Sequence, residues 1–157
     1  MKEITMNLLY LVKGNQVLLA MKKRGHGAGR YNGIGGKMQP GESIEDTLIR
    51  ESQEEIGVKP IKFEKKAYIT FDLYMKGEHT FEHVYIFTIP EWSGEPTESE
   101  EVAPKWFDID KLPFEKMWPN DVHFVQKILK GDKVIGHFKL DKQDDIISYE
   151  VKTVDKF

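Results

Sequence analysis

The chain has 157 residues, no cysteine, and a formal net charge of −3 from 26 acidic and 23 basic residues. This length and an apolar fraction of 39% favour a single globular domain over residues 1–157, and the lack of cysteine excludes disulfides and thiol chemistry. The slight negative charge argues against binding a long nucleic acid through many phosphates. The apolar runs are too short to span a bilayer and the N-terminus lacks a signal-peptide pattern, so we expect a cytoplasmic protein.

The first residues predict a hairpin followed by a loop. Two apolar, β-branched-rich runs at residues 3–13 and 16–22 flank Gly14-Asn15, a pair typical of a two-residue hairpin turn. Residues 23–36 differ from both runs, because six glycines stand there among basic and aromatic residues. This composition indicates a structured loop.

A helix is predicted over about residues 44–56. Ser43 and Asp46 have the spacing of a capping box, in which each side chain bonds the backbone N–H of the other residue. The apolar residues at helical spacing that follow are Ile44, Leu48, Ile49 and Ile56. Gly57 supplies the stop, since glycine adopts the left-handed conformation common just after helix ends.

The middle of the chain predicts a second hairpin. Residues 66–75 and 80–89 are rich in β-branched and aromatic side chains and flank a Lys-Gly-Glu turn. Residues 91–101 are polar and acidic, with proline and glycine, and are expected to form a loop. A short strand is expected to open at Trp106 and Phe107.

The last part predicts a helix and a closing hairpin. Asn120 is a suitable N-cap for a helix that ends at Gly131. Its core positions would be the apolar residues at helical spacing, Val122, Val125, Ile128 and Leu129. Residues 133–140 and 145–153 are expected to pair as strands. Mixed strands with two principal helices predict an α/β fold in which a mixed sheet lies between helices.

Three glutamates carry the main chemical signal. Glu54 and Glu55 follow Glu51 by three and four residues, so a helix places all three on one side. Their like charges repel, and a divalent cation would reverse the sign of that interaction. Oxygen ligands suit Mg²⁺, which is commonly shared between carboxylates and substrate phosphates. A solvated acidic face has the same spacing, and Arg50 can simply pair with Glu54, so the spacing alone leaves both readings open.

The segment GGKMQPGESIEDTLIRESQEEIGV, residues 35–58, closely resembles the Nudix box. The family positions that it matches are Gly36, Glu42, Arg50, Glu51, Glu54, Glu55, Gly57 and Val58. One departure is Ser52, where the family usually has an apolar residue and where serine would weaken packing of the helix on the sheet. The resemblance implies the Nudix fold, a mixed sheet sandwiched between helices.

The resemblance also implies a metal-dependent pyrophosphatase, in which water attacks a phosphorus of a nucleoside diphosphate linked to a further group. The ligands implied for Mg²⁺, with Mn²⁺ able to substitute, are Gly36, Glu51, Glu54, Glu55 and Glu101. Arg50 would orient a glutamate. The general base varies within the family, and Glu54, Glu55 and Glu101 are the candidates here. Glu101 qualifies only if folding brings it to the metal, and is otherwise a solvated loop residue.

Outside the box, the resemblance covers most of the chain and is to the MutT-related oxidised-purine nucleoside triphosphatases. It is carried by KKRGHGAGRYNGIGGK, PKWFDIDKLPFEKMWPND and GHFKLDKQD. Enzymes of this group release monophosphate and pyrophosphate from damaged purine triphosphates such as 8-oxo-dGTP. The substrate-binding residues then expected are Asn7, Lys22, Asn32, Gly35, Gly36, Phe71, Trp118, Asn120 and Asp121.

Several of these residues also have a purely structural reading. Trp118 and Phe71 fit core aromatics as well as stacking surfaces for a purine. Asn120 and Asp121 fit a helix N-terminus as well as recognition of a base edge. Spacing alone favours the structural readings, and the resemblance reverses this for Trp118 and Asp121.

The base pocket departs from the resembled group at several positions. Two adjacent aspartates are usual where this chain has Asn120-Asp121, and an amide cannot exchange a proton with its neighbour. We therefore expect a narrower base preference than such a pair allows. The other departures are Asn7 for Thr, His26 for Phe, and Leu73 and Leu140 for Phe.

The sequence is also compatible with other functions. One is a Nudix pyrophosphatase for another nucleoside polyphosphate, a methylated purine triphosphate or capped RNA. A local group of basic residues is compatible with an RNA substrate, and its members are Lys22, Lys23, Arg24 and Arg30. An alternative of another class is a silent nucleotide-binding module, against which the intact glutamates argue. We expect a small nucleotide as the partner, no membrane, and a monomer.

Overall fold

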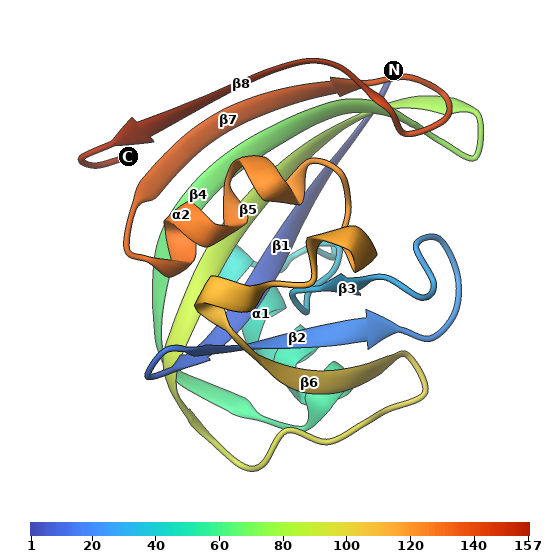
Figure 1. Cartoon of the computed structure of the whole chain (residues 1–157). Coiled ribbons are helices and arrows are strands. Elements are labelled where there is room, and N and C mark those ends of the chain that lie inside the picture. The colour runs from blue at the N-terminus through green and yellow to red at the C-terminus, as the bar shows by residue number, and fades with distance from the viewer.

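The computed structural model describes all 157 residues. An eight-stranded mixed sheet forms its centre, and helices α1 (Ile44–Ile56) and α2 (Val125–Leu129) lie on opposite faces of that sheet (Figure 1). This arrangement confirms the predicted fold class. The strands are β1 (Lys2–Lys13), β2 (Gln16–Lys22), β3 (Tyr31–Asn32), β4 (Lys59–Met75), β5 (Glu78–Ser93), β6 (Val102–Asp108), β7 (Lys133–Leu140) and β8 (Ile146–Val154). No helix combines the length and the apolar character needed to cross a membrane.

The strand order is β3-β2-β1-β5-β4-β7-β8, and β6 pairs with β2. β1 runs parallel to β5, and β4 runs parallel to β7, whereas the remaining pairs are antiparallel. β1 and β2 pair only next to their turn, at Val12 and Lys13 with Gln16 and Val17. Farther along, β1 forms isolated bridges to the loop that leads into α1. β1 therefore contacts both the hairpin and the loop that carries the glycines.

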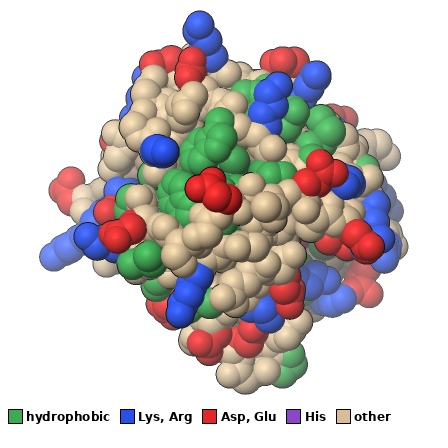
Figure 2. Space-filling model, turned by 90° about the horizontal axis from the view of Figure 1, so that it is seen from below, with side chains coloured by type: hydrophobic (Ala, Val, Ile, Leu, Met, Phe, Trp, Pro, Cys, Tyr) green, Lys and Arg blue, Asp and Glu red, His purple; other side chains and the backbone are tan.

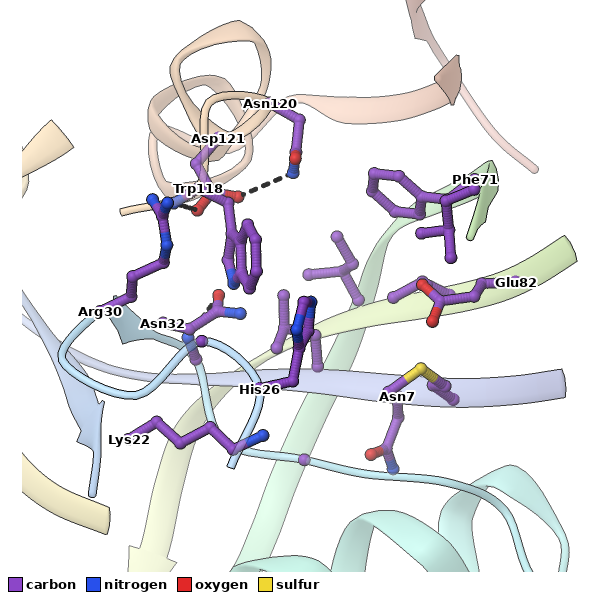
Figure 3. A pocket seen from close by; sticks show the side chains of 18 of the residues that line it. Asn7, Lys22, His26, Arg30, Asn32, Phe71, Glu82, Trp118, Asn120 and Asp121 are labelled. Atoms are coloured by element: carbon purple, nitrogen blue, oxygen red, sulfur yellow. Dashed lines mark hydrogen bonds between the residues drawn. The ribbon is translucent and has the colours of Figure 1, made fainter. Parts of the chain in front are cut away.

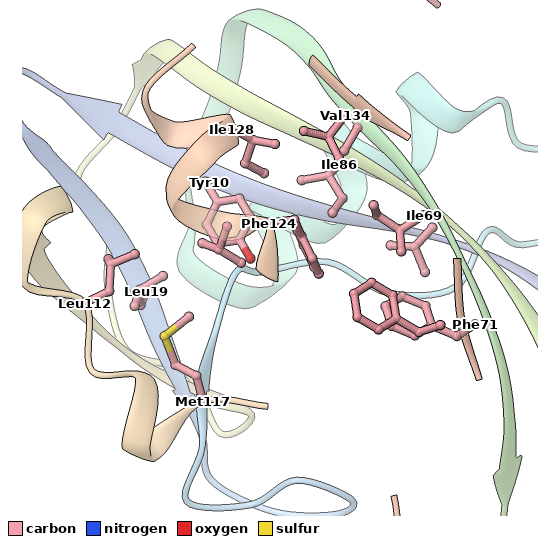
Figure 4. Packing of buried hydrophobic residues seen from close by; sticks show 14 of the residues in the cluster. Tyr10, Leu19, Ile69, Phe71, Ile86, Leu112, Met117, Phe124, Ile128 and Val134 are labelled. Atoms are coloured by element: carbon pink, nitrogen blue, oxygen red, sulfur yellow. The ribbon is translucent and has the colours of Figure 1, made fainter. Parts of the chain in front are cut away.

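Hydrophobic side chains form one cluster on each face of the sheet. Figure 4 shows residues of the cluster on the α2 face, among them Tyr10 and Ile128. Successive residues of a strand point to opposite faces, so Leu9 and Leu11 of β1 pack with Leu48 of α1. Tyr10 between them packs on the other face with Ile128 of α2. All five side chains are at most 1% exposed. The two clusters fix the helices on the sheet through burial of apolar area.

Helix α1 forms as predicted. The backbone N–H of Asp46 donates to Ser43 Oγ at 3.1 Å and that of Ser43 donates to Asp46 Oδ2 at 3.0 Å, which completes the capping box. Gly57 ends the helix in the left-handed conformation, with φ of 70°. Ser52 is fully buried, and its hydroxyl donates to the Leu48 carbonyl at 2.8 Å. The helix therefore satisfies this polar departure internally.

Three strands extend beyond their predicted bounds. β4 begins at Lys59, well before the predicted start at residue 66. The prediction missed this first part because register shifts interrupt its alternation of apolar residues. β5 continues to Ser93, into the expected acidic loop. β6 opens at Val102, so Trp106 and Phe107 lie near its end rather than at its start.

The continuous second helix predicted from Asn120 is wrong. The Asn120 side chain makes no capping bond, and a 3₁₀ turn at Asp121–His123 precedes a short α2. Phe124, with φ of −146°, separates the two, because its side chain enters the core on the α2 face. Val122, predicted in the core, is 56% exposed, whereas Val125 is buried as predicted.

Candidate active site

A cavity of about 290 Å³ lies among the sheet, the glycine-rich loop and the segment before α2 (Figure 3). The predicted substrate-binding residues that line it are Asn7, Lys22, Asn32, Gly35, Phe71, Trp118, Asn120 and Asp121. Glu55 and Glu101 line it as well. The predicted site residues outside its wall are Gly36, Arg50, Glu51 and Glu54. One hollow thus joins the expected base-binding residues to the acidic side of α1.

Arg50 links the loop before α1 to the glutamates of the helix. Its Nε and Nη2 donate to the two carboxylate oxygens of Glu42 at 2.7 and 3.0 Å. Its Nη1 donates to Glu51 at 2.8 Å and to Glu54 at 3.2 Å, and Nη2 also donates to the Lys37 carbonyl at 3.1 Å. The hydrogen bond from Arg50 lowers the pKa of Glu42 to about 2. The planar guanidinium therefore holds three carboxylates in fixed relative positions.

Gly35 and Gly36 bring the loop backbone close to the glutamates. The Gly35 N–H donates to Glu55 Oε2 at 2.7 Å, and the Gly36 N–H donates to Asn7 Oδ1 at 3.3 Å. A Cβ on Gly35, where φ is 148°, would lie 2.2 Å from the Asn7 carbonyl oxygen, and one on Gly36 would lie 2.7 Å from Glu51 Oε1. Neither position accepts a side chain without displacement. The Nδ2 of Asn7 is buried and has no acceptor.

Burial controls the charges of the α1 carboxylates. It raises the pKa of Glu55 to about 8, and the nearby charges of Glu51 and Glu101 add to this rise. It also raises the pKa of Glu51 against the opposing effect of Arg50. A cation would stabilise these ionised forms, so the oxygen donors fit a divalent metal. Glu51 and Glu54 bond Arg50 here, and no three carboxylate or imidazole groups are gathered at metal-binding spacing.

Folding brings Glu101 to the same cavity as Glu55, although its side chain is exposed. Its carboxylate accepts hydrogen bonds from Arg24, from Nε at 3.0 Å and from Nη2, and these bonds lower its pKa. The backbone N–H of Lys23 donates to the Glu101 carbonyl at 2.8 Å. Glu101 is therefore an ion-paired residue at the edge of the cavity rather than a freely solvated one.

Trp118 projects into the cavity, with Arg30 on one side and His26 on the other (Figure 3). The Arg30 guanidinium carbon is 4.5 Å from the Trp118 ring centre, and the His26 ring centre is 5.1 Å from it. Phe71 is 8% exposed and stacks on Phe138 with ring centres 5.4 Å apart. Phe71 is thus a core aromatic that also lines the cavity, while Trp118 offers a more accessible ring.

Hydrogen-bonding groups gather beside Trp118. Asp121 Oδ2 accepts the Trp118 backbone N–H at 3.0 Å, and Asp121 Oδ1 accepts Asn120 Nδ2 at 3.3 Å. Burial raises the pKa of Asp121 to about 7. Asn32 Oδ1 accepts the Gly33 N–H at 2.9 Å, which leaves the Asn32 amide nitrogen for other partners. The capping reading of Asn120 is wrong, since its side chain bonds Asp121 instead of the helix backbone.

Arg30 and Glu82 are among the cavity residues to which sequence reasoning assigned no catalytic or base-binding role. Arg30 packs on Trp118, and nothing in its sequence position indicated this contact. Glu82 lies on β5 and alternates with the buried Thr80 and Val84. An acidic residue on the core-facing side of a predicted strand was the signal that could have revealed it.

A family model described as the NUDIX domain matches residues 1–128. The chain is 44% identical over 150 residues to an oxidized purine nucleoside triphosphate hydrolase of Mus musculus, with 96% of this chain and 95% of that protein covered. It is 41% identical to a Danio rerio protein of the same name, with the same coverage. The solved MutT mutator protein from Bacillus halodurans matches with a TM-score of 0.82 at 27% identity, covering 95% of this chain and 97% of that one. The chain belongs to the NUDIX family of hydrolases.

Proposed function

We propose that the chain hydrolyses oxidised purine nucleoside triphosphates, with 8-oxo-dGTP as the first candidate, to the monophosphate and pyrophosphate. The observation that carries this proposal is the cavity, whose lining combines aromatic and amide side chains with the half-buried carboxylate of Glu55. The two vertebrate relatives support the same substrate class, because each aligns over nearly all of this chain. A small nucleotide is the partner that such a cavity accommodates.

The proposed cofactor is Mg²⁺, with Mn²⁺ able to replace it, because NUDIX hydrolases generally use divalent ions. The residues that would hold it are Gly36, through its carbonyl, and Glu51, Glu54, Glu55 and Glu101. When bound, such an ion neutralises phosphate charge and lowers the pKa of water. Arg50 positions Glu51 and Glu54 through its hydrogen bonds.

Glu55 is the first candidate for the general base. The Gly35 N–H holds its Oε2 at 2.7 Å, which leaves Oε1 to accept a proton from the attacking water. Glu54 and Glu101 are the other candidates, and each is engaged by an arginine. Glu55 is preferred because no arginine or lysine bonds its carboxylate, so its oxygen is the more basic acceptor.

Base recognition is assigned to Trp118 by stacking and to Asn32, Asn120 and Asp121 by hydrogen bonds. Asn120 donates to Asp121, so its amide presents one fixed pattern, and only Asp121 changes protonation near neutral pH. We therefore propose a narrower base preference than two exchangeable carboxyls would give. Comparable turnover of 8-oxo-dGTP and 2-oxo-dATP would contradict this part of the proposal.

The test is pyrophosphate release with Mg²⁺ from 8-oxo-dGTP, 2-oxo-dATP, O6-methyl-dGTP and dGTP. Glu55→Gln should abolish turnover, whereas Glu45→Gln, at an exposed position in the first turn of the same helix, should leave it unchanged. A strong preference for one damaged base in wild type supports the proposal. No turnover of any of the four would favour another nucleoside polyphosphate or a silent binding module.

We also propose a monomeric enzyme of the cytoplasm that does not act on long nucleic acids. On the face seen in Figure 2, basic and acidic side chains are interspersed rather than gathered into a basic track. A basic track is what binding to many phosphates requires. Size-exclusion chromatography with light scattering tests the monomer, and hydrolysis of a capped oligonucleotide would contradict the proposed substrate class.

A further inference from the structure

Glu82 places a carboxylate on an otherwise apolar wall of the cavity. On β5 it alternates with Val84 and Ile86, and its cross-strand partners are Phe71 on β4 and Ile4 on β1. Of these, Phe71, Val84 and Ile86 line the cavity and belong to the hydrophobic cluster on the α2 face. A methionine or leucine would complete this wall without the cost of burying a charge. The acidic side chain at this position therefore requires an explanation.

The Glu82 carboxylate has no partner within the protein. No hydrogen bond or ion pair involves it, and Lys37 affects it only through longer-range charge. Burial raises its pKa to about 6, so the group is mostly ionised at neutral pH. The carboxylate is only partly buried and lines the cavity, so its oxygens are free to accept a hydrogen bond from a bound ligand.

The position of Glu82 indicates which part of a ligand it meets. Figure 3 shows the side chain extending into the pocket from the wall across from Trp118, on the same side as Phe71. The pair Asn120 and Asp121, proposed to read the base, lies beside Trp118, and the α1 carboxylate that lines the same cavity is Glu55. A negatively charged phosphate would be repelled by Glu82, whereas an uncharged donor would pair with it.

We propose that Glu82 is a specificity residue whose carboxylate accepts a hydrogen bond from a donor on the bound nucleoside, a sugar hydroxyl or an exocyclic amino group. This inference rests on the proposed function only in requiring that the cavity bind a nucleotide. It makes Glu82 a residue that selects among nucleotides and leaves the bond-breaking step to the α1 carboxylates.

The experiment measures dissociation constants of products by calorimetry, so that binding is separated from catalysis. The ligands are 8-oxo-dGMP, its 2′,3′-dideoxy analogue, and 8-oxo-dIMP, which lacks the 2-amino group. The proteins are wild type, Glu82→Met, Glu82→Gln, and Glu91→Gln as a matched control at an exposed position on β5. Glu82→Met should weaken 8-oxo-dGMP binding about tenfold or more, since it removes the charged acceptor. Glu82→Gln keeps an acceptor oxygen and should lose less affinity for 8-oxo-dGMP than Glu82→Met. Glu91→Gln should bind 8-oxo-dGMP as tightly as wild type.

The analogues identify the donor. If the effect of Glu82→Met disappears for the dideoxy analogue, the donor is the sugar hydroxyl, and if it disappears for 8-oxo-dIMP, the donor is the amino group. Either result supports the proposal. An equal loss for all three ligands, or no loss for any, would overturn it, and Glu82→Gln keeps the test valid if the methionine variant does not fold. If wild type binds none of the three, the proposed function fails instead.

Discussion

Replacement of Asp121 by asparagine tests the energetic cost of the buried carboxyl beside Trp118. Asp121 is 2% exposed, and burial raises its pKa to about 7 from a usual value of about 4. Such a group binds its proton more tightly in the folded state than in the unfolded chain. Its contribution to the free energy of unfolding is therefore fully present below about pH 4 and is lost as the pH rises to about 7.

The size of the effect follows from the shift. About three pKa units correspond to roughly 4 kcal/mol of lost stability above pH 7. An asparagine side chain resembles the protonated carboxyl, keeps an acceptor for the Trp118 N–H, and does not ionise. Asp121→Asn should therefore be more stable than wild type at high pH, and its advantage should grow by about 3 kcal/mol between pH 5 and pH 8.

Urea unfolding of both proteins at pH 5 and pH 8 measures this difference. Glu55 and Glu82 also titrate in this range, but they are present in both proteins, so the difference isolates Asp121. Asp132→Asn, at an exposed position after α2, serves as the control and should follow wild type at both pH values. If the difference in the free energy of unfolding between Asp121→Asn and wild type stayed constant or shrank with rising pH, the raised pKa of Asp121 would be refuted.

Four other substitutions test the fold, the hydrolytic residues and the base preference separately. Gly35→Ala should cost several kcal/mol of stability, because its Cβ would lie 2.2 Å from a backbone carbonyl, whereas Gly36→Ala should displace only the Glu51 carboxylate and lower kcat at an unchanged melting temperature. Arg50→Lys loses the bidentate hydrogen bond to Glu42, so the free energy of unfolding in urea should fall by about 1–3 kcal/mol and kcat should fall as well. An unchanged free energy of unfolding would contradict a stabilising role for the hydrogen bonds of Arg50. Asn120→Asp should raise kcat/KM for 2-oxo-dATP relative to 8-oxo-dGTP, and an unchanged ratio would show that the amide does not narrow the preference.

The elements that sequence predicts well here are those with local determinants. Helix α1 is specified by its capping box, its apolar spacing and Gly57, all within one segment. The continuous helix predicted from Asn120 was wrong because tertiary contacts override the helical spacing of its apolar residues. Phe124 packs in the core and Asp121 faces the cavity. The start of β4 was hidden because its bulges break the alternation on which strand prediction depends.

The site itself was less accessible to sequence reasoning, because its parts come from distant segments. Asn7 and Trp118 line one cavity only through the pairing of strands and the packing of the segment before α2. The family resemblance supplied these positions, and spacing alone favoured core roles for the aromatic residues. Glu82 was missed because it lies outside the motifs that carry the resemblance, although its place in an apolar strand face was visible.

The separation of the two hydrophobic clusters has a consequence for how this protein can change over time. The glutamates belong to a helix that packs on one face of the sheet, while the segment from Trp118 to Phe124 joins the cluster on the other. Substitutions at sites that share no contacts combine almost additively in free energy. The departures at His26, Leu73 and Asn120 all line the cavity, and Glu55 is the α1 residue that lines it with them. Substitutions around Trp118 and Asn120 can therefore alter nucleotide preference with little effect on the packing of α1, which belongs to the cluster on the other face of the sheet.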